Sequence, residues 1–462
     1  MSSSAYALVV LFLINLMNFF DRQIIGGVGE GIRREWALSD TALGLLGTVF
    51  TLLYAVVGLP LGRLSDRWPR KWILSGGVFA WSALTALSGL ARSFPQLAAA
   101  RLGVGVGEAS CSPASTSLIG DLFPTAKRAR AVAIWMLGLP LGLGLANGAG
   151  GWIQQHWGWR NAFYVAAVPG VLCALLALGV REPARGAVEA HAVGARRREG
   201  NPYLLVASIP TILWIIVSGA LHNFNMYALG SFLVPFLVRV HKMTFQNAGW
   251  TAAVVYGFSG VVGLVGGGAL ADRLYRRRVD GRLIVGTAAI AVCTPFMFLA
   301  LMRPSGDIVG FGLLMGIGSG VMYAYYSTVY ATIHDVVEPA LRGTAMAMYF
   351  CAMYLLGASL GPVGTGLVSD YFTFQAASAA GAVQPLPFGA LMLAELRSLV
   401  GESKGFDQRA LEPFRAQGLH TAIFIVPILA AVLAVVLFAA SRTVKRDVAR
   451  LQDWMRAQKS EV

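Results

Sequence analysis

Charged residues are scarce in this chain: they make up 13% of its 462 residues, against 56% hydrophobic residues. A soluble domain usually carries about 25% charged residues. At half that content the chain has too little polar surface to cover a water-soluble core, which excludes a soluble globular enzyme. The composition is typical of a protein that crosses a lipid bilayer many times.

Cysteine and the common catalytic motifs are also nearly missing. The four cysteines lie in apolar stretches and form no C-x-x-C pair, so we expect small core side chains rather than disulfides or a zinc site. No Walker A loop and no H-E-x-x-H motif occurs, and the G-x-S-x-G match at 357–361 lies in an apolar helical run without the strand that a hydrolase requires. We therefore expect no enzyme, no resident metal and no cofactor. The cysteines are Cys111, Cys173, Cys293 and Cys351.

Apolar stretches of roughly 20 residues, the length that crosses a bilayer, occur twelve times. Each is expected to be a helix, because lipid offers the backbone no hydrogen-bond partners. The sequence thus predicts an all-α membrane protein with twelve transmembrane helices in two sets of six. The spans are expected near 5–28, 41–62, 72–91, 95–120, 129–153 and 161–181, and then near 204–236, 246–270, 282–302, 306–332, 342–369 and 418–440.

The segments between the spans define the expected domains. An N-terminal six-helix unit covers 1–181, and a polar, basic linker covers 182–201. A C-terminal six-helix unit covers 202–440 and carries an external insertion at 371–417, with a short helix near 388–400. The basic tail at 441–462 is expected to be a helix that either lies on the inner leaflet or ends in water. Its apolar face comprises Val444, Val448, Leu451 and Met455.

Lysine and arginine set the predicted orientation. With the N-terminus in the cytoplasm, 24 of the 37 basic residues fall on the cytoplasmic side, as the positive-inside rule requires. We therefore expect a multi-pass inner (plasma) membrane protein with both termini in the cytoplasm. The first span lacks a basic n-region and a cleavage site, so it is expected to be retained. This distribution explains the net charge of +14 without any nucleic acid partner.

A ten-residue loop pattern occurs once in each half of the chain. The pattern G-x-L-x-D-R-x-x-R-[KR] follows the second span at 62–71 and the eighth span at 268–277, so the halves are parallel repeats. This loop resembles the signature of the major facilitator superfamily. The resemblance implies two pseudo-symmetric six-helix bundles that rock around a central cavity, and a cytoplasmic gating loop. The gating residues would be Gly62, Asp66, Arg67, Arg70, Asp272 and Arg273.

Ionisable residues inside two of the spans are candidate functional groups, because such charges cost several kcal/mol in a membrane. The first span carries Asn18, Asp21 and Arg22, and the fourth carries Arg101 and Glu108. Seven residues separate the last two, which places them on one helix face about 10 Å apart. Asp21 and Arg101 are expected at similar depth. One interpretation is a proton and substrate switch, and the other is a static ion pair that fixes helix register.

Two strings narrow the resemblance to the Spinster branch of the superfamily. They are N-F-F-D-R at 18–22 and R-L-G-V-G-V-G-E-A-S at 101–110. The resemblance implies that Asp21 and Glu108 take part in proton coupling, and that Arg22 and Arg101 are charge partners or head-group contacts. Cys111 departs from the family, which usually has an aromatic residue there.

The second half offers polar and aromatic residues but no matching buried acid. Asn18, His222, Asn223 and Tyr323 are further candidates for contact with a substrate, although the tyrosines could simply pack between helices. A cavity charged on one side and aromatic on the other suits an amphipathic molecule. The predicted function is proton-coupled transport of lysophospholipids or related lipids by a monomer, with the proton as coupling ion. The alternatives are a drug or organic-anion transporter, or a membrane lipid-binding protein or enzyme that transports nothing.

Overall fold

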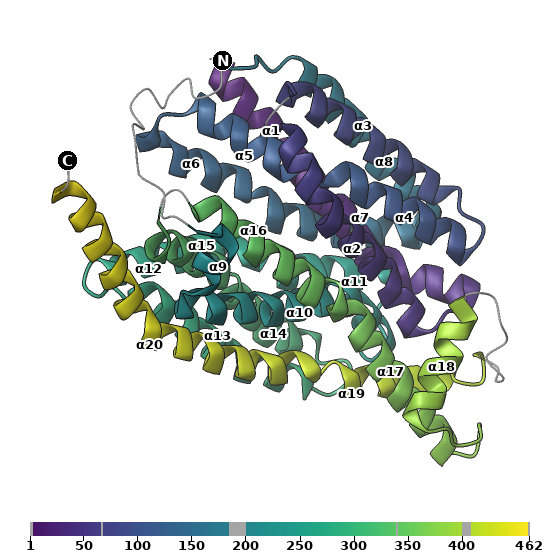
Figure 1. Cartoon of the computed structure of the whole chain (residues 1–462). Coiled ribbons are helices and arrows are strands. Elements are labelled where there is room, and N and C mark those ends of the chain that lie inside the picture. The colour runs from purple at the N-terminus through teal and green to yellow at the C-terminus, as the bar shows by residue number, and fades with distance from the viewer. Residues whose placement is uncertain (1–2, 66–67, 184–199, 339–340, 400–407, 461–462) are drawn as a thin grey trace.

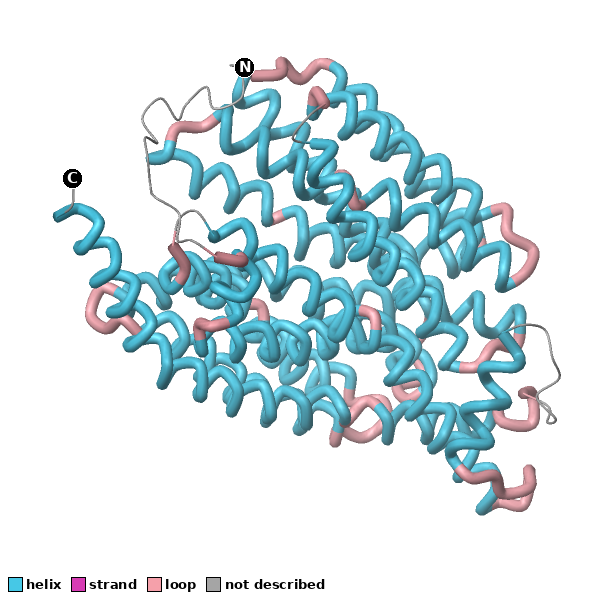
Figure 2. Tube along the Cα trace, viewed as in Figure 1, coloured by secondary structure: helices cyan, strands magenta, loops and turns pink. Residues whose placement is uncertain are grey.

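The computed structural model describes residues 3–65, 68–183, 200–338, 341–399 and 408–460. Within these ranges the chain is helical and contains no strand (Figure 2). Eleven helical stretches of the described part are long and apolar enough to cross a membrane. The predicted all-α membrane fold is thereby confirmed, and the expected span that is not among the eleven, the fourth one at 95–120, is divided, as explained below.

The helices follow the expected order. In the first half they are α1 (Ser3–Trp36), α2 (Asp40–Ser65), α3 (Arg70–Gly89), α4 (Phe94–Glu108), α5 (Cys111–Leu122), α6 (Thr125–Met136), α7 (Gly138–Trp157) and α8 (Trp159–Leu178). The second half begins with α9 (Pro202–Ala207), α10 (Pro210–Arg239), α11 (Phe245–Ala252), the π-helical turn η1 (Ala253–Phe258), α12 (Ser259–Tyr275), α13 (Gly281–Leu301), α14 (Ile308–Met322) and α15 (Ala324–Val336). It ends with α16 (Arg342–Ala352), the π-helical turn η3 (Met353–Ala358), α17 (Leu360–Ala379), α18 (Phe388–Leu399), the 3-10 turn η4 (Glu412–Phe414), α19 (Arg415–Ala422) and α20 (Ile425–Ser460).

The helices gather into two groups that lie against each other, α1 to α8 in one and α9 to α20 in the other (Figure 1). A single cluster of buried apolar side chains runs through both groups, from Ile14 of α1 to Leu437 of α20. Both chain ends lie at the same end of the helices (Figure 1). We call that end the termini side and the opposite end the far side.

The fourth predicted span, 95–120, is broken in the middle. α4 ends at Glu108 and α5 begins at Cys111. Pro113 has no N–H to donate to the carbonyl of Ala109 four residues earlier. In addition, Ser110 Oγ donates to the carbonyl of Gly107 at 2.8 Å, which competes with the helical hydrogen bonds. The break leaves Glu108 at the end of a helix, inside the membrane domain.

Glycines bring the two groups into close contact. A Cβ on Gly257 would lie 2.3 Å from the Cα of Gly144 on α7, so only glycine fits where α7 crosses η1. Likewise, a Cβ on Gly44 of α2 would lie 2.3 Å from the carbonyl oxygen of Pro362 on α17. At both crossings the backbones approach so closely because no side chain stands between them.

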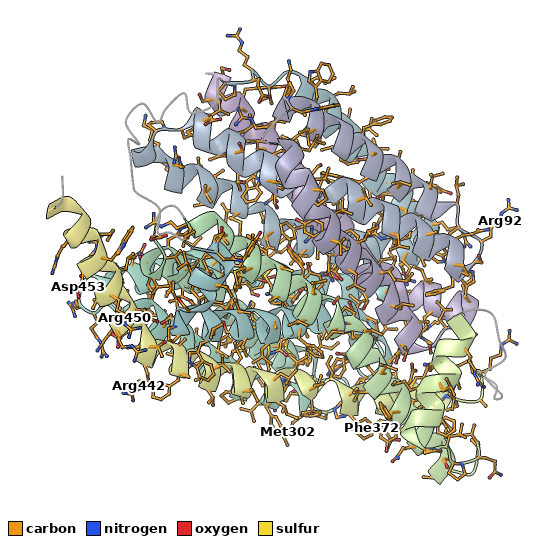
Figure 3. All side chains as sticks on the ribbon, in the orientation of Figure 1. Arg92, Met302, Phe372, Arg442, Arg450 and Asp453 are labelled. Carbon is orange, nitrogen blue, oxygen red and sulfur yellow. The ribbon has the colours of Figure 1, made fainter. Side chains whose placement is uncertain are left out.

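The insertion and the tail take defined positions. The short helix expected near 388–400 is α18, while α17 extends to Ala379, beyond the predicted start of the insertion. The tail continues α20, and its Val444 and Val448 are buried against the protein, so this part does not lie flat on a membrane. Arg442 and Arg450 point outward from α20 (Figure 3). Most of the linker, 184–199, lies outside the described residues.

The tail is also anchored by a specific contact. Asp447 Oδ2 accepts hydrogen bonds from the backbone N–H of Thr211, at 2.9 Å, and from its hydroxyl, at 2.6 Å. A carboxylate at a helix N-terminus satisfies an N–H that has no partner within the helix. Asp447 therefore caps α10, whereas most of 451–456, farther along the tail, is exposed.

Candidate functional site

Two buried ion pairs connect α1 with α4 near the middle of the first group. Arg22 Nη2 lies 3.3 Å from Glu108 Oε2, and Arg101 Nη1 lies 3.5 Å from Asp21 Oδ1. Glu108 is 0% exposed and Arg22 is 9% exposed. Charges that are removed from water require partners. The two helices thus supply one acid and one base each, and the pairs cross between them.

The Glu108 carboxylate is held from one side only. Its Oε2 accepts from Asn18 Nδ2 at 3.0 Å, and Arg22 Nη2 also donates to Asn18 Oδ1 at 3.1 Å. The other oxygen, Oε1, has no hydrogen-bond partner among the described residues. Glu108 therefore keeps one oxygen available for a proton, a water molecule or a substrate donor, although it is completely buried.

Both carboxylate oxygens of Asp21 have hydrogen-bond partners, unlike those of Glu108. Thr85 Oγ1 of α3 donates to Asp21 Oδ2 at 2.6 Å, and Arg101 Nη2 donates to the Asp21 carbonyl at 2.9 Å. The guanidinium of Arg101 also lies over the Phe50 ring, 5.3 Å from its centroid. Two helices besides α1 thus hold Asp21 directly, α3 and α4, which is the arrangement expected of a group that sets helix positions.

Arg22 extends from the first group to the second. Its Nη1 donates to the hydroxyls of Tyr227 on α10, at 3.3 Å, and Tyr354 in η3, at 3.1 Å. Its guanidinium also lies 4.3 Å from the ring centroid of Tyr54 on α2. Tyr354 stands in a π-helical turn, a feature that frequently occurs at functional sites. Arg22 is therefore the cation through which Glu108 contacts the second group.

The sequence did not single out Tyr54, Tyr227, Tyr354 or Thr85. Nothing in their spacing distinguishes them from the other hydroxyl residues of the apolar runs. The available signal was weak: a tyrosine that is buried in a membrane needs a partner for its hydroxyl. Only the position of the Arg22 side chain shows which tyrosines it meets.

Three predicted contact residues lie elsewhere, inside the second group. The His222 ring stacks on Tyr325 with 3.9 Å between centroids, and neither of its ring nitrogens has a partner among the described residues. Asn223 donates to the carbonyl of Gly219 at 3.0 Å and accepts from Tyr326 at 3.1 Å. Tyr323 is fully buried, with its hydroxyl unpartnered in the described part. The structure does not bring these three side chains to the charged pairs.

The repeated loops are only partly described. Asp66 and Arg67 lie outside the described residues, and Gly62 lies in α2. Arg70 is fully buried: its Nε donates to Glu182 at 2.7 Å, its Nη1 donates to Ser117 at 2.9 Å, and it pairs with Asp121. All these partners belong to the first group, so Arg70 fastens α3, α5 and the end of α8 together.

The second copy of the loop uses a different arginine. Asp272 pairs with Arg282 at 3.0 Å, and Arg282 also pairs with Asp335, which lies near the end of α15 as Asp121 lies near the end of α5. By the sequence repeat, Arg276 should stand where Arg70 stands, but Arg276 is exposed. Thus an Arg–Asp ion pair occurs in both halves, but the arginine stands at a different position relative to the repeated loop.

The Glu182 contact predicts an acid-sensitive stability. Partial burial opposes ionisation of Glu182, but hydrogen bonds from the Arg70 side chain and the backbone N–H groups of Arg70 and Lys71 outweigh it and hold its pKa below the usual value. A lowered pKa stabilises the fold above the ordinary value of about 4.3, and this stabilisation is lost as pH falls through the folded-state pKa.

We therefore expect Glu182→Gln to lower stability at pH 7 by about 0.5–1 kcal/mol. The difference in melting temperature between this variant and the unmodified protein should shrink as the pH is lowered to about 4 or below. A thermal unfolding series across that range measures it. A difference that is the same at every pH would contradict the assignment.

A third set of buried charges, which the sequence did not reveal, joins the two groups on the far side. Arg239 at the end of α10 lies 2.6 Å from Glu30 Oε2 of α1 and 2.8 Å from Asp40 Oδ1 of α2. Asp370 of α17 accepts from the N–H of Thr41 at 2.7 Å. We call this set the far-side network. It comprises Glu30, Arg33, Asp40, Arg239, Asp370, Glu412 and Arg415.

Two helical groups that meet around buried ion pairs define a polytopic carrier of the two-bundle class. The model of the Major Facilitator Superfamily matches residues 11–362. The chain belongs to this superfamily and, from the relatives described next, to its Spinster branch; it is a transporter and not an enzyme.

Several known proteins are similar over most of the chain. An MFS-type efflux pump of Mycolicibacterium smegmatis is 31% identical, over 79% of this chain and 85% of that protein. Protein spinster homolog 1 of Mus musculus is 32% identical, over 79% and 73%. The sphingosine-1-phosphate transporter SPNS2 of Danio rerio is 30% identical, over 78% and 75%. The crystal structure of a bacterial Spinster homolog, inward-facing and occupied, superimposes with a TM-score of 0.79 at 28% identity and covers 97% of this chain and 98% of that one.

Proposed function

We propose that this chain is a proton-coupled transporter of lysophospholipids or related amphipathic lipids, working by alternating access as a monomer. The proton would be the coupling ion, and no other cofactor would be needed. Both termini would lie in the cytoplasm, so the termini side would be the inner side of the plasma membrane. The observation that carries the proposal is the single contact chain from Glu108 through Arg22 to Tyr227 and Tyr354.

The contact chain supports coupling in the following way. A proton on Glu108 would remove the negative charge that holds Arg22, while Asn18 could still hydrogen-bond to the neutral acid. Arg22 would then be free to bind an anionic group, since guanidinium binds phosphate in a bidentate manner. Loss of the proton would restore the Glu108–Arg22 pair and displace the anion. Proton binding and anion binding would thus favour each other.

The surroundings of Arg22 favour an amphipathic substrate. Its guanidinium lies within 5.0 Å of the Phe19 ring centroid and 4.3 Å of the Tyr54 ring centroid. A cation among aromatic rings can hold a phosphate while the rings contact an apolar chain. The name of the zebrafish relative, a sphingosine-1-phosphate transporter, is consistent with such a molecule.

The distribution of contacts supports alternating access. The far-side network holds the groups together on one side. On the termini side, α5 and α6 pack against helices of the first group, and α15 packs against helices of the second. In the proposed cycle, this structure is the state open toward the termini side. Arg70, Asp272 and Arg273, with Asp66 and Arg67, would form the gate that closes in the opposite state.

Transport can be tested in vesicles that contain the purified protein and a fluorescent lysophospholipid. We expect uptake that follows an imposed pH gradient and stops when a proton ionophore removes it. Asp21→Asn should slow uptake by about 5- to 150-fold, because the loss of its charge frees Arg101 to compete for the same anions.

Three outcomes of this transport experiment would contradict the proposed function. Uptake that ignores the gradient would contradict proton coupling. If the protein moves organic anions but no lipid, the alternative function, a drug or organic-anion transporter, would be favoured. The mycobacterial relative is named as an efflux pump. Saturable lipid binding without movement of anything would favour a membrane lipid-binding protein.

A further inference from the structure

A deep apolar groove lies on the outer surface of the second group, between α12, α13 and α14. Its volume is about 980 Å³, near the upper end of the 300–1,000 Å³ that is usual for ligand pockets. Val262, Leu270 and Leu313, which line it, are exposed and would face lipid. The groove lies away from the Arg22 site, and no residue of that site lines it.

The groove is apolar along its length and basic at one end. Arg273 and Arg277, near the end of α12 on the termini side, are the charged residues that line it. No carboxylate within the described ranges forms an ion pair with either of them, since the neighbouring Asp272 pairs with Arg282. From Arg273 to Val262 is about 16 Å along the helix, roughly the hydrocarbon depth of one leaflet.

We infer that this groove binds one anionic phospholipid of the leaflet on the termini side. Its phosphate lies against Arg273 and Arg277, and an acyl chain lies along α12 toward Val262. The charge of the two arginines selects an anionic head group, because a basic residue near the surface attracts anionic lipid with a measurable free energy. The missing side chains of Gly266 and Gly316 leave the space that the acyl chain fills.

The glycines allow a steric test. A Cβ on Gly266 would meet no atom within 4 Å, so Gly266→Leu fits the fold and fills the groove about 10 Å from Arg273. The matched control is Gly76→Leu in α3. Gly76 is also exposed, its Cβ would also meet nothing within 4 Å, and it lies outside the groove.

The experiment is native mass spectrometry of the full chain titrated with phosphatidylglycerol or phosphatidylcholine. We expect phosphatidylglycerol to bind about 25-fold more tightly, and Arg273→Gln or Arg277→Gln to weaken it about fivefold each. Binding of phosphatidylcholine should weaken less, because its choline already balances the charge of its phosphate. Gly266→Leu should weaken binding of both lipids, while Gly76→Leu should change neither. Equal affinity for the two lipids, or equal effects of the two leucine variants, would overturn the inference.

Discussion

Replacing Glu108 with glutamine is expected to reduce pH-driven lipid accumulation by about 5- to 150-fold, the usual range of coupling between two sites of one protein. Glutamine has the size of glutamate, and its amide oxygen can still accept from Asn18 and Arg22, which donate to Glu108 in the structure. It cannot take up or release a proton. The variant should therefore fold and bind lipid, while the pH gradient can no longer drive it.

The measurement that isolates this effect compares two kinds of flux. Accumulation against a gradient should fall, whereas exchange of labelled for unlabelled lipid at equal pH should persist, because Arg22 stays free to bind the anion. Glu35→Gln is the control, since Glu35 lies at the far-side end of α1, outside the charged site, in a partly exposed pair with Arg160. Loss of exchange together with accumulation would indicate a structural role for Glu108 and contradict the proton switch.

The sequence predicted the charged pairs because charge is rare inside apolar runs. Asp21, Arg22, Arg101 and Glu108 each interrupt a span, so their position alone identified them. The partners were only partly predictable. Similar depth favoured Asp21 with Arg101, but the contact between Arg22 and Glu108 depends on how α1 and α4 rotate about their axes. Rotation is set by packing, which no single-sequence pattern records.

The far-side network escaped prediction for a different reason. The expected spans ended at 28 and 236, whereas α1 reaches Trp36 and α10 reaches Arg239. These bounds place Glu30 and Arg239 just outside the expected spans. The actual helices are longer than a bilayer requires, and their ends pack against each other instead of separating into loops. Charge at a helix end is common, so only the tertiary contacts reveal that these charges are buried.

The far-side network should be the strongest connection between the two groups, and Arg239→Met tests it. This change leaves Glu30 and Asp40, both 0% exposed, without their shared cation. Removing one partner of a buried ion pair usually costs about 3–5 kcal/mol. Because the network joins the groups, the cost falls on the far-side-closed state, and the equilibrium should shift toward the far-side-open state.

A reporter cysteine would detect that shift. Thr48 of α2 is buried and donates to the Ser359 carbonyl in the second group, at 2.5 Å, so a cysteine there is covered while the far side is closed. In a Thr48→Cys protein without its native cysteines, Arg239→Met should speed labelling by a membrane-impermeant maleimide and lower the melting temperature. Arg160→Met, which removes the more exposed far-side pair with Glu35, should change neither, since such pairs are worth about 0–1 kcal/mol. Unchanged labelling in the Arg239 variant would mean that glycine packing, and not charge, keeps the far side closed.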